Sequence, residues 1–199
     1  MAHDHTHVKE FFGVRAADWD ARFPDDGPAY AAAAAGMGLR PGDSVLDAGC
    51  GTGRAMVALR DAVGPRGRVL GADLTPEMLS AAVRGGRDAL GVLLLADVAR
   101  LPLRAGCLDA VFAAGLIAHL PDPATDLREL ARVVRPGGRL ALFHPIGRAA
   151  LAARQGRRIT PDDLRAEDRL RPLLAEAGWR MESYVDEDER FLALAVRAD

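Results

Sequence analysis

Short apolar segments alternate with longer amphipathic ones along most of the chain. The apolar segments are typical of strands buried on both faces of a sheet, and they occupy residues 44–49, 67–73, 92–97, 108–115 and 139–145. The amphipathic segments are typical of helices that end at glycine, and they occupy residues 54–64, 75–86 and 122–138. Because buried strands alternate with helices, the pattern predicts a parallel sheet covered by helices on both faces.

Both ends of the chain depart from this alternation. Before the first strand, residues 8–24 predict one or two short helices and residues 29–40 an alanine-rich helix. After the last parallel strand, a helix at 162–178 precedes two strands joined by the polar sequence DEDER at 186–190. Strands joined by so short a link are antiparallel neighbours. The sheet is therefore expected to end in an antiparallel hairpin, with DEDER as its solvated tip.

Composition narrows the class of protein. The 199 residues are 49% hydrophobic and 27% charged, which is typical of one globular domain with a full core. The net charge of -2 gives no general attraction to nucleic acid or to an anionic membrane. The two cysteines, Cys50 and Cys107, are too few for a disulfide framework, and the N-terminus has no signal-peptide pattern. We therefore expect a cytoplasmic protein that binds neither nucleic acid nor membrane.

The sequence VLDAGCGTGR at 45–54 joins the first strand to a glycine-rich loop. Gly49 and Gly51 let the backbone come close to a ligand. The dinucleotide fingerprint requires another glycine at position 54, where this chain has Arg54. Asp47, at the end of the strand, can hold the loop amides or meet a cationic ligand group, and it would repel a pyrophosphate. The loop therefore disfavours a dinucleotide.

Three acidic residues end three successive strands. Asp73, at the tip of the second strand, is placed to accept hydrogen bonds from both hydroxyls of a ribose. Asp97, beside Val98 after the third strand, is placed to accept from an adenine amino group. Any one of Asp47, Asp73 and Asp97 could instead be a helix cap or a solvated loop residue. The three together, with the glycine loop, fit those roles poorly and favour a nucleoside ligand in the crevice at the strand ends.

Five stretches together resemble one family, the class I S-adenosylmethionine-dependent methyltransferases, in the small ubiquinone/menaquinone-biosynthesis-like (methyltransferase type 11) branch. They are VLDAGCGTGR, VLGADLTPEML, LLLADVARLPL, LDAVFAAGLIAHLPDP and LRELARVVRPGGRLAL, in the right order over about residues 43–143. The resemblance implies a Rossmann-like α/β fold with a seven-stranded sheet in the order 3-2-1-4-5-7-6, the last strand antiparallel and helices on both faces. It implies one methyltransferase domain over 1–199, divided into an N-terminal helical lid at 1–40, a cofactor-binding core at 41–145 and a C-terminal helix and hairpin at 146–199.

The resemblance also implies S-adenosyl-L-methionine as cofactor and the residues that bind it. The methionine part would meet Asp47, Ala48, Gly49, Cys50, Gly51 and Gly53, and its amino group would meet the backbone of Ala114. The ribose would bind Asp73, with Leu74 and Met78 nearby. The adenine would bind Asp97 and Val98.

Two histidines are candidates for chemistry. His119 follows the fourth strand, where it either has a structural role or contacts the substrate as a general base. His144 ends the fifth strand on the same edge of the sheet, and the same two roles are open for it. With Arg148 just beyond it, His144 would suit a polar or anionic acceptor.

The N-terminal segment is rich in aromatic residues. Phe11, Phe12, Trp19 and Phe23 either pack as the apolar face of an ordinary helix or wall the acceptor pocket under a lid, and both roles can hold together. The sequence HDHTH places His3, Asp4, His5 and His7 at spacings that could hold a metal ion. Nothing else in the sequence forms a second ligand cluster, so we expect no metal site.

These observations predict a methyltransferase that acts on a small-molecule acceptor, as a monomer or homodimer. The segment AAGLIAHL after the fourth strand lacks the Asp/Asn-Pro-Pro-aromatic motif of many amino-methylating enzymes, which disfavours adenine or glutamine as acceptor. Methylation at oxygen, nitrogen or carbon stays open. One alternative is a catalytically silent binding or regulatory protein with the same fold. A nicotinamide-dependent oxidoreductase is a second alternative, disfavoured by Arg54 and the terminal hairpin.

Overall fold

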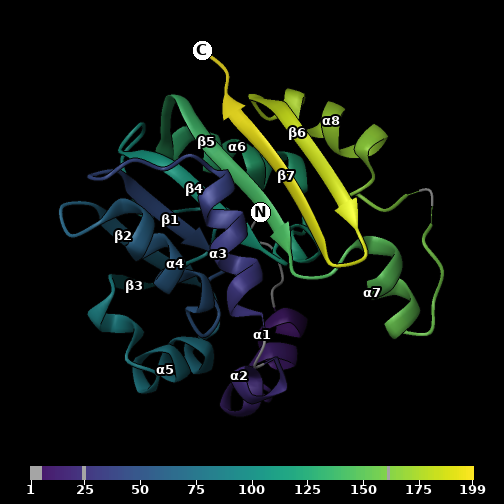
Figure 1. The fold of residues 1–199 in the computed structure, drawn as a ribbon, viewed down its shortest axis with the longest axis horizontal. Coiled ribbons are helices and arrows are strands. Elements are labelled where there is room, and N and C mark those ends of the chain that lie inside the picture. The colour runs from purple at the N-terminus through teal and green to yellow at the C-terminus, as the bar shows by residue number, and fades with distance from the viewer. Residues whose placement is uncertain (1–5, 24–25, 161) are drawn as a thin grey trace.

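The computed structural model describes residues 6–23, 26–160 and 162–199. Its strands form one seven-stranded sheet in the order β3-β2-β1-β4-β5-β7-β6 (Figure 1). Strand β7 runs antiparallel to both of its neighbours, and the other pairings are parallel. The strands are β1 (Ser44–Ala48), β2 (Arg68–Asp73), β3 (Val92–Leu95), β4 (Leu108–Ala114), β5 (Val134–His144), β6 (Trp179–Glu187) and β7 (Arg190–Arg197). The predicted sheet order and terminal hairpin are confirmed.

Helices cover both faces of this sheet. They are α1 (Thr6–Gly13), α2 (Trp19–Arg22), α3 (Gly27–Gly36), α4 (Arg54–Val63), α5 (Pro76–Arg84), α6 (Pro123–Val133), α7 (Arg148–Arg154) and α8 (Glu167–Glu176), with 3-10 turns at Ala16–Asp18, Arg87–Ala89 and Ile117–His119. None of the helices in the described ranges is long and apolar enough to cross a membrane.

Strand β4 shows why the central strands are apolar throughout. Its residues Ala110 and Phe112 belong to the core shared with α3 and α4, whereas Val111 and Ala113 belong to the core shared with α6 and α8. All four side chains are buried. Successive side chains of a strand point to opposite faces, so a strand between two helical layers requires an unbroken apolar run.

The predicted helix at 122–138 is too long. Helix α6 ends at Val133, and the chain is extended from Val134 onward as β5. Arg135 precedes Pro136, and the proline ring disfavours a helical conformation in the residue before it. Arg135 also forms an ion pair with Asp109 at 2.7 Å across the sheet.

Two further differences lie in the C-terminal part. Helix α7 was not predicted, and the helix expected from residue 162 begins only at Glu167, after a turn in which Asp163 accepts the backbone N–H of Arg165. The sequence DEDER is not simply a solvated tip. Asp186 lies within β6, where its carboxylate binds Arg148.

The first helices lie at the carboxyl edge of the sheet. Figure 1 shows α1 and α2 below the end of β5, away from the layers that cover the two faces. Helix α1 packs against α5, and α3 packs against α4. The N-terminal segment is therefore placed over the edge at which ligands bind in parallel α/β sheets.

Candidate active site

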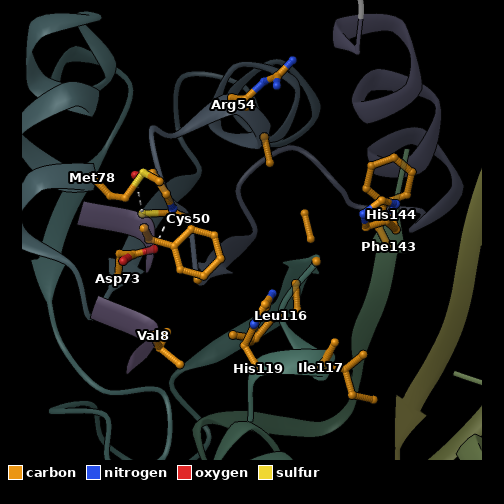
Figure 2. Close-up of a pocket in the computed structure, with 18 of the residues that line it drawn as sticks. Val8, Cys50, Arg54, Asp73, Met78, Leu116, Ile117, His119, Phe143 and His144 are labelled. Carbon is orange, nitrogen blue, oxygen red and sulfur yellow. Dashed lines mark hydrogen bonds between the residues drawn. The ribbon is translucent and has the colours of Figure 1, made fainter. Parts of the chain in front are cut away.

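A cavity of about 520 Å³ opens at the carboxyl ends of the central strands. Figure 2 shows Cys50, Asp73 and Met78 on one side of it and Phe143 and His144 on the other. Most of the candidate residues line this one cavity, namely Asp47, Gly49, Cys50, Gly51, Asp73, Leu74, Met78, Asp97, Val98, Ala114, Phe11, Phe12, Trp19, Phe23, His119 and His144. The fold thus brings together residues from the glycine loop, the strand ends and the N-terminal helices.

Three candidates do not line the cavity: Ala48, Gly53 and Arg148. Ala48 is completely buried within the sheet. Gly53 has φ +78° and precedes α4, and a Cβ there would lie 2.9 Å from Cγ of Arg87. Gly53 is therefore required for the turn into α4.

The glycine loop is bonded to the end of β2. The N–H groups of Gly49 and Cys50 donate to the carbonyl of Ala72 at 2.8 and 3.0 Å. Gly49 and Gly51 have φ values of +69° and +54°, in the left-handed region that favours glycine. These bonds fix the path of the loop along the cavity wall, with no side chain at either glycine between the backbone and a ligand.

Asp73 is the acidic residue to which this loop is anchored. Its Oδ2 accepts the N–H of Gly51 at 2.8 Å, and its Oδ1 accepts the N–H of Thr75 at 2.8 Å. Burial raises the pKa of Asp73, and these amide hydrogen bonds oppose the rise. A carboxylate oxygen can accept a second hydrogen bond, so both oxygens remain able to meet a ligand hydroxyl.

Asp97 lies after β3, on the same edge of the sheet. Its Oδ1 accepts the N–H of Ala99 at 2.9 Å, which orients the carboxyl group beside the buried Val98. Both residues line the cavity, as the candidate adenine site requires.

Asp47 is the least satisfied acidic residue of the site. It is 1% exposed, and no described residue donates a hydrogen bond to its Oδ2. Burial, and secondarily the charge of Asp73, raises the pKa of Asp47 to about 8. A buried carboxyl group at a cavity wall, lacking a partner on one oxygen, fits a ligand that carries positive charge.

The N-terminal segment is tied directly to the glycine loop. Thr52 Oγ1 donates to Asp20 Oδ1 at 2.5 Å, and Arg54 forms an ion pair with Asp26 at 3.5 Å. Arg54 also donates to the carbonyl of Phe23. Arg54, which stands where a dinucleotide site has glycine, therefore joins this segment to the loop. No local sequence pattern predicts these bonds, because the partners are about thirty residues apart in the chain.

Removing one of these bonds tests whether the segment acts as a lid. Thr52→Val keeps the size of the side chain but loses the bond to Asp20, so we expect about fivefold weaker binding of S-adenosylhomocysteine, through faster dissociation. Stopped-flow measurement of the dissociation rate checks this. Asp18→Ala, at an exposed residue of the same segment, should leave the rate unchanged, and equal rates in wild type and Thr52→Val would show that the bond does not hold the lid.

Aromatic side chains form the wall opposite the sheet. Phe12 packs edge-on against Trp19, with ring centres 5.5 Å apart, and Trp19 packs against Phe23 at 5.3 Å. Phe12 also packs edge-on against His119 at 5.1 Å. These rings thus pack against one another and also line the cavity, whereas their role as a wall of the acceptor pocket stays a prediction.

Both candidate histidines favour the neutral form. His119 is an exposed residue, but desolvation by the surrounding protein still lowers its pKa, and the charge of Arg165 lowers it further. Nδ1 of His144 lies 2.9 Å from the carbonyl oxygen of Ile146 and 3.2 Å from its nitrogen. Burial lowers the pKa of His144, the contact with Ile146 opposes this, and Arg165 lowers it again. A neutral imidazole can accept a proton from an acceptor molecule.

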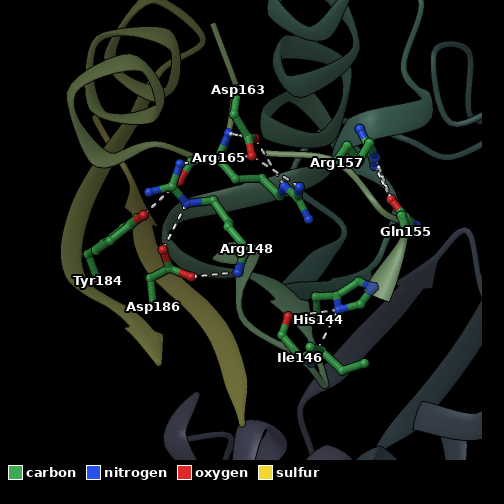
Figure 3. A network of polar contacts seen from close by, with 9 residues as sticks. All are labelled: His144, Ile146, Arg148, Gln155, Arg157, Asp163, Arg165, Tyr184 and Asp186. Carbon is green, nitrogen blue, oxygen red and sulfur yellow. Dashed lines mark hydrogen bonds and ion pairs between the residues drawn. The ribbon is translucent and has the colours of Figure 1, made fainter. Parts of the chain in front are cut away.

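Arg148 does not reach the cavity. Its Nε donates to Asp186 Oδ2 at 2.8 Å, and its Nη1 lies 3.8 Å from Asp163 (Figure 3). Three other arginines of the C-terminal part line the cavity instead: Arg154, Arg157 and Arg165. Arg154 ends α7, Arg157 lies just after it, and Arg165 lies in the turn before α8. The sequence pattern predicted neither α7 nor this turn.

The N-terminal His3, Asp4 and His5 lie outside the described residues. Within the ranges that the structure describes, no group of three histidine, cysteine, aspartate or glutamate residues is arranged to hold a metal ion.

Comparison with known proteins identifies the domain. The family model described as "Methyltransferase domain" matches residues 46–142. A demethylmenaquinone methyltransferase of Bacillus cereus is 33% identical over 127 residues, which cover 60% of this chain and 52% of that protein. An uncharacterized 37.1 kDa protein in transposon TN4556 of Streptomyces fradiae is 43% identical over 110 residues, 55% of this chain and 32% of that protein. The chain thus spans about half the length, or less, of these curated relatives.

A solved structure shows the same fold over nearly the whole chain. Magnesium protoporphyrin IX methyltransferase from Synechocystis, with bound S-adenosylhomocysteine, superposes with a TM-score of 0.74 at 21% identity. The match covers 98% of this chain and 100% of that one. Sheet order, glycine loop and strand-end acidic residues agree with this match, and residues 46–142 form a methyltransferase domain of the class I S-adenosylmethionine-dependent kind.

Proposed function

We propose that this protein transfers the methyl group of S-adenosylmethionine to a small-molecule acceptor. The observation that carries the proposal is that one cavity contains both ends required for this reaction. One end has the glycine loop with Asp47 and Asp73, and the other has aromatic side chains with His119 and His144. A cytoplasmic monomer or homodimer is part of the same proposal.

The cofactor end offers a partner for each part of the cofactor. The free acceptor capacity of Asp73 suits the two ribose hydroxyls, and Asp97 with Val98 suits the adenine. The buried Asp47 suits the positive charge of the methionine part. Gly49, Gly51 and the backbone of Ala114 complete this binding surface.

The bound cofactor supplies a sulfonium whose methyl group is already electrophilic. The residues of this chain therefore have to position the acceptor in line with that methyl group and to exclude water. Phe12, Trp19 and Phe23 serve the second task, because they close the cavity with apolar rings.

A proton acceptor is needed only when the acceptor atom carries a proton that must leave. His119 and His144 both have lowered pKa values and both line the cavity, so either can take that proton. Transfer to oxygen, nitrogen or an activated carbon is compatible with this arrangement.

The two alternative functions are disfavoured for separate reasons. A silent protein would have no need of a buried acid such as Asp47 beside the glycine loop, whose Oδ2 accepts no hydrogen bond from the described residues. A nicotinamide dinucleotide would bring a pyrophosphate toward Asp47, and Arg54 is occupied by Asp26 and Phe23.

Calorimetric titration separates the three functions. We expect S-adenosylhomocysteine to bind at micromolar or tighter affinity and NAD to give no measurable heat. Tight binding of NAD would favour the oxidoreductase, and no binding of either ligand would favour the silent protein. A tritium-transfer assay with labelled S-adenosylmethionine and a panel of small acceptors then tests turnover itself.

A further inference from the structure

The far end of the cavity is built from arginines on an apolar background. Arg154 ends α7, Arg157 follows it, and Arg165 lies in the turn before α8. Leu151, Ile146 and Phe191 line the same end of the cavity. An apolar pocket that contains fixed guanidinium groups is suited to a ligand with an apolar body and an anionic group.

Arg165 is held in place by Asp163 along one edge of its guanidinium. Nε donates to Oδ1 and Nη2 to Oδ2 of Asp163, both at 3.1 Å (Figure 3). A guanidinium has five N–H donors, so three remain after these two bonds. Nη1 donates no hydrogen bond to any other described residue, and the side chain is only 13% exposed. Its second edge is therefore free for another planar acceptor.

Arg148 supports this arrangement from outside the cavity. Asp186 holds Arg148, and Arg148 in turn lies 3.8 Å from Asp163. Two arginines and two aspartates thus form a balanced network, in which Arg165 is oriented toward the cavity. Arg157 is bonded to the neutral Gln155, so its charge adds to the positive field at this end.

The carboxylates that line the cavity do not cancel this field. Asp47, Asp73 and Asp97 form the cofactor end. Asp26 is paired with Arg54, and Asp126, in α6, is completely buried. The lowered pKa values of His119 and His144 are in part a response to Arg165, so its positive charge is felt where the acceptor would lie.

We propose that the acceptor is an apolar or aromatic molecule that carries a carboxylate, and that Arg165 binds this carboxylate in a bidentate manner with support from Arg154 and Arg157. This inference rests on the proposed methyl transfer and names its substrate class. Arg165 acts as a specificity residue, since it fixes the acceptor by its anionic group while the reacting atom faces the cofactor.

The test compares matched probes that differ only in charge. Benzoate, 2-naphthoate and octanoate are each titrated against the corresponding neutral amide, into protein saturated with S-adenosylhomocysteine. We expect at least one carboxylate to bind about tenfold more tightly than its amide. The carboxylate forms charge-assisted bidentate hydrogen bonds with the guanidinium, whereas the amide offers only a neutral acceptor. The preference should shrink when salt is raised, since Arg154 and Arg157 are exposed. If no carboxylate in the panel binds more than about twofold better than its amide, the proposal is wrong.

Variants locate the effect. Arg165→Gln should reduce the preference to within about twofold, whereas Arg158→Gln, which does not line the cavity, should leave it intact. Binding of S-adenosylhomocysteine to Arg165→Gln should equal that of wild type, which shows that the variant is folded. If it does not, the double variant Arg154→Gln/Arg157→Gln takes its place, with an expected threefold loss of preference. If the variant that still binds S-adenosylhomocysteine normally keeps the full preference for carboxylates over amides, the assignment is contradicted.

The two proposals fail in different ways. Loss of the methyltransferase function itself would appear as wild-type protein that does not bind S-adenosylhomocysteine. Failure of the acceptor assignment would appear as protein that binds S-adenosylhomocysteine normally but shows no preference for carboxylates.

Discussion

Asp73→Ala is expected to weaken the binding of S-adenosylhomocysteine by at least about 100-fold, the loss of two charge-assisted hydrogen bonds. The carboxylate is proposed to accept the ribose hydroxyls, and it also holds the N–H groups of Gly51 and Thr75. The substitution therefore removes ligand contacts and releases the loop that shapes the site. Calorimetry on the purified variant measures the change.

The control for this experiment is Asp61→Ala. Asp61 is exposed on α4, so its removal changes the net charge equally without touching the cavity. Thermal unfolding of both variants shows that the sheet is intact. Unchanged affinity in Asp73→Ala would overturn the ribose assignment. Equal losses of affinity in both variants would show that the effect comes only from the change in net charge.

Asp47→Asn is expected to remove most of the pH dependence of S-adenosylmethionine binding. The free protein holds a proton on Asp47 up to a pKa of about 8, whereas a bound cation favours the ionised form. Wild-type affinity should therefore rise with pH and level off above about pH 8, and binding at pH 7 should release a proton. Titration in two buffers with different ionisation enthalpies measures the released proton, which the variant should lack. Equal proton release in the two proteins would contradict the role of Asp47.

The same substitution is expected to stabilise the free protein at alkaline pH. The raised pKa means that the unfolded chain ionises Asp47 above about pH 4, while the folded state does not until about pH 8. The contribution of Asp47 to the free energy of unfolding is thus fully present at low pH and is lost as the pH rises to about 8. Each pKa unit corresponds to about 1.4 kcal/mol and each kcal/mol to roughly 2–4 °C, so a pKa raised from 3.8 to about 8 implies that the variant unfolds on the order of 10 °C higher at pH 9. Below about pH 4 the two proteins should differ little.

The convergence of Asp47, Asp73 and Asp97 on one cavity could be predicted from the sequence, because these residues lie at fixed positions relative to strands. Asp47 lies one residue before the end of β1, Asp73 ends β2, and Asp97 follows β3 closely, so the apolar pattern that locates the strands also locates them. The parallel sheet then brings the three to one edge without further information.

The acceptor end could not be predicted in the same way. Whether Arg148 or Arg165 faces the cavity depends on Asp163 and Asp186, which come from a turn and from a distant strand. The bonds of Thr52 and Arg54 to the N-terminal segment are also long-range. Local patterns locate elements, but such side-chain pairs are decided by tertiary packing. The end of α6 is a different case, because its signal is local: Pro136 disfavours a helical conformation at Arg135, and the helix ends at Val133.

The two ends of the cavity come from separate stretches of the chain, with residues 47–98 forming one and the N-terminal helices, α7 and the turn before α8 forming the other. Substitutions in α7 and in the turn before α8 can accumulate without disturbing the first set, because it is the N-terminal segment that is bonded to the glycine loop. This division gives the protein a route by which its choice of acceptor can drift during evolution while its cofactor stays the same. It also marks residues 146–166 as a segment that can be exchanged by design to retarget the enzyme.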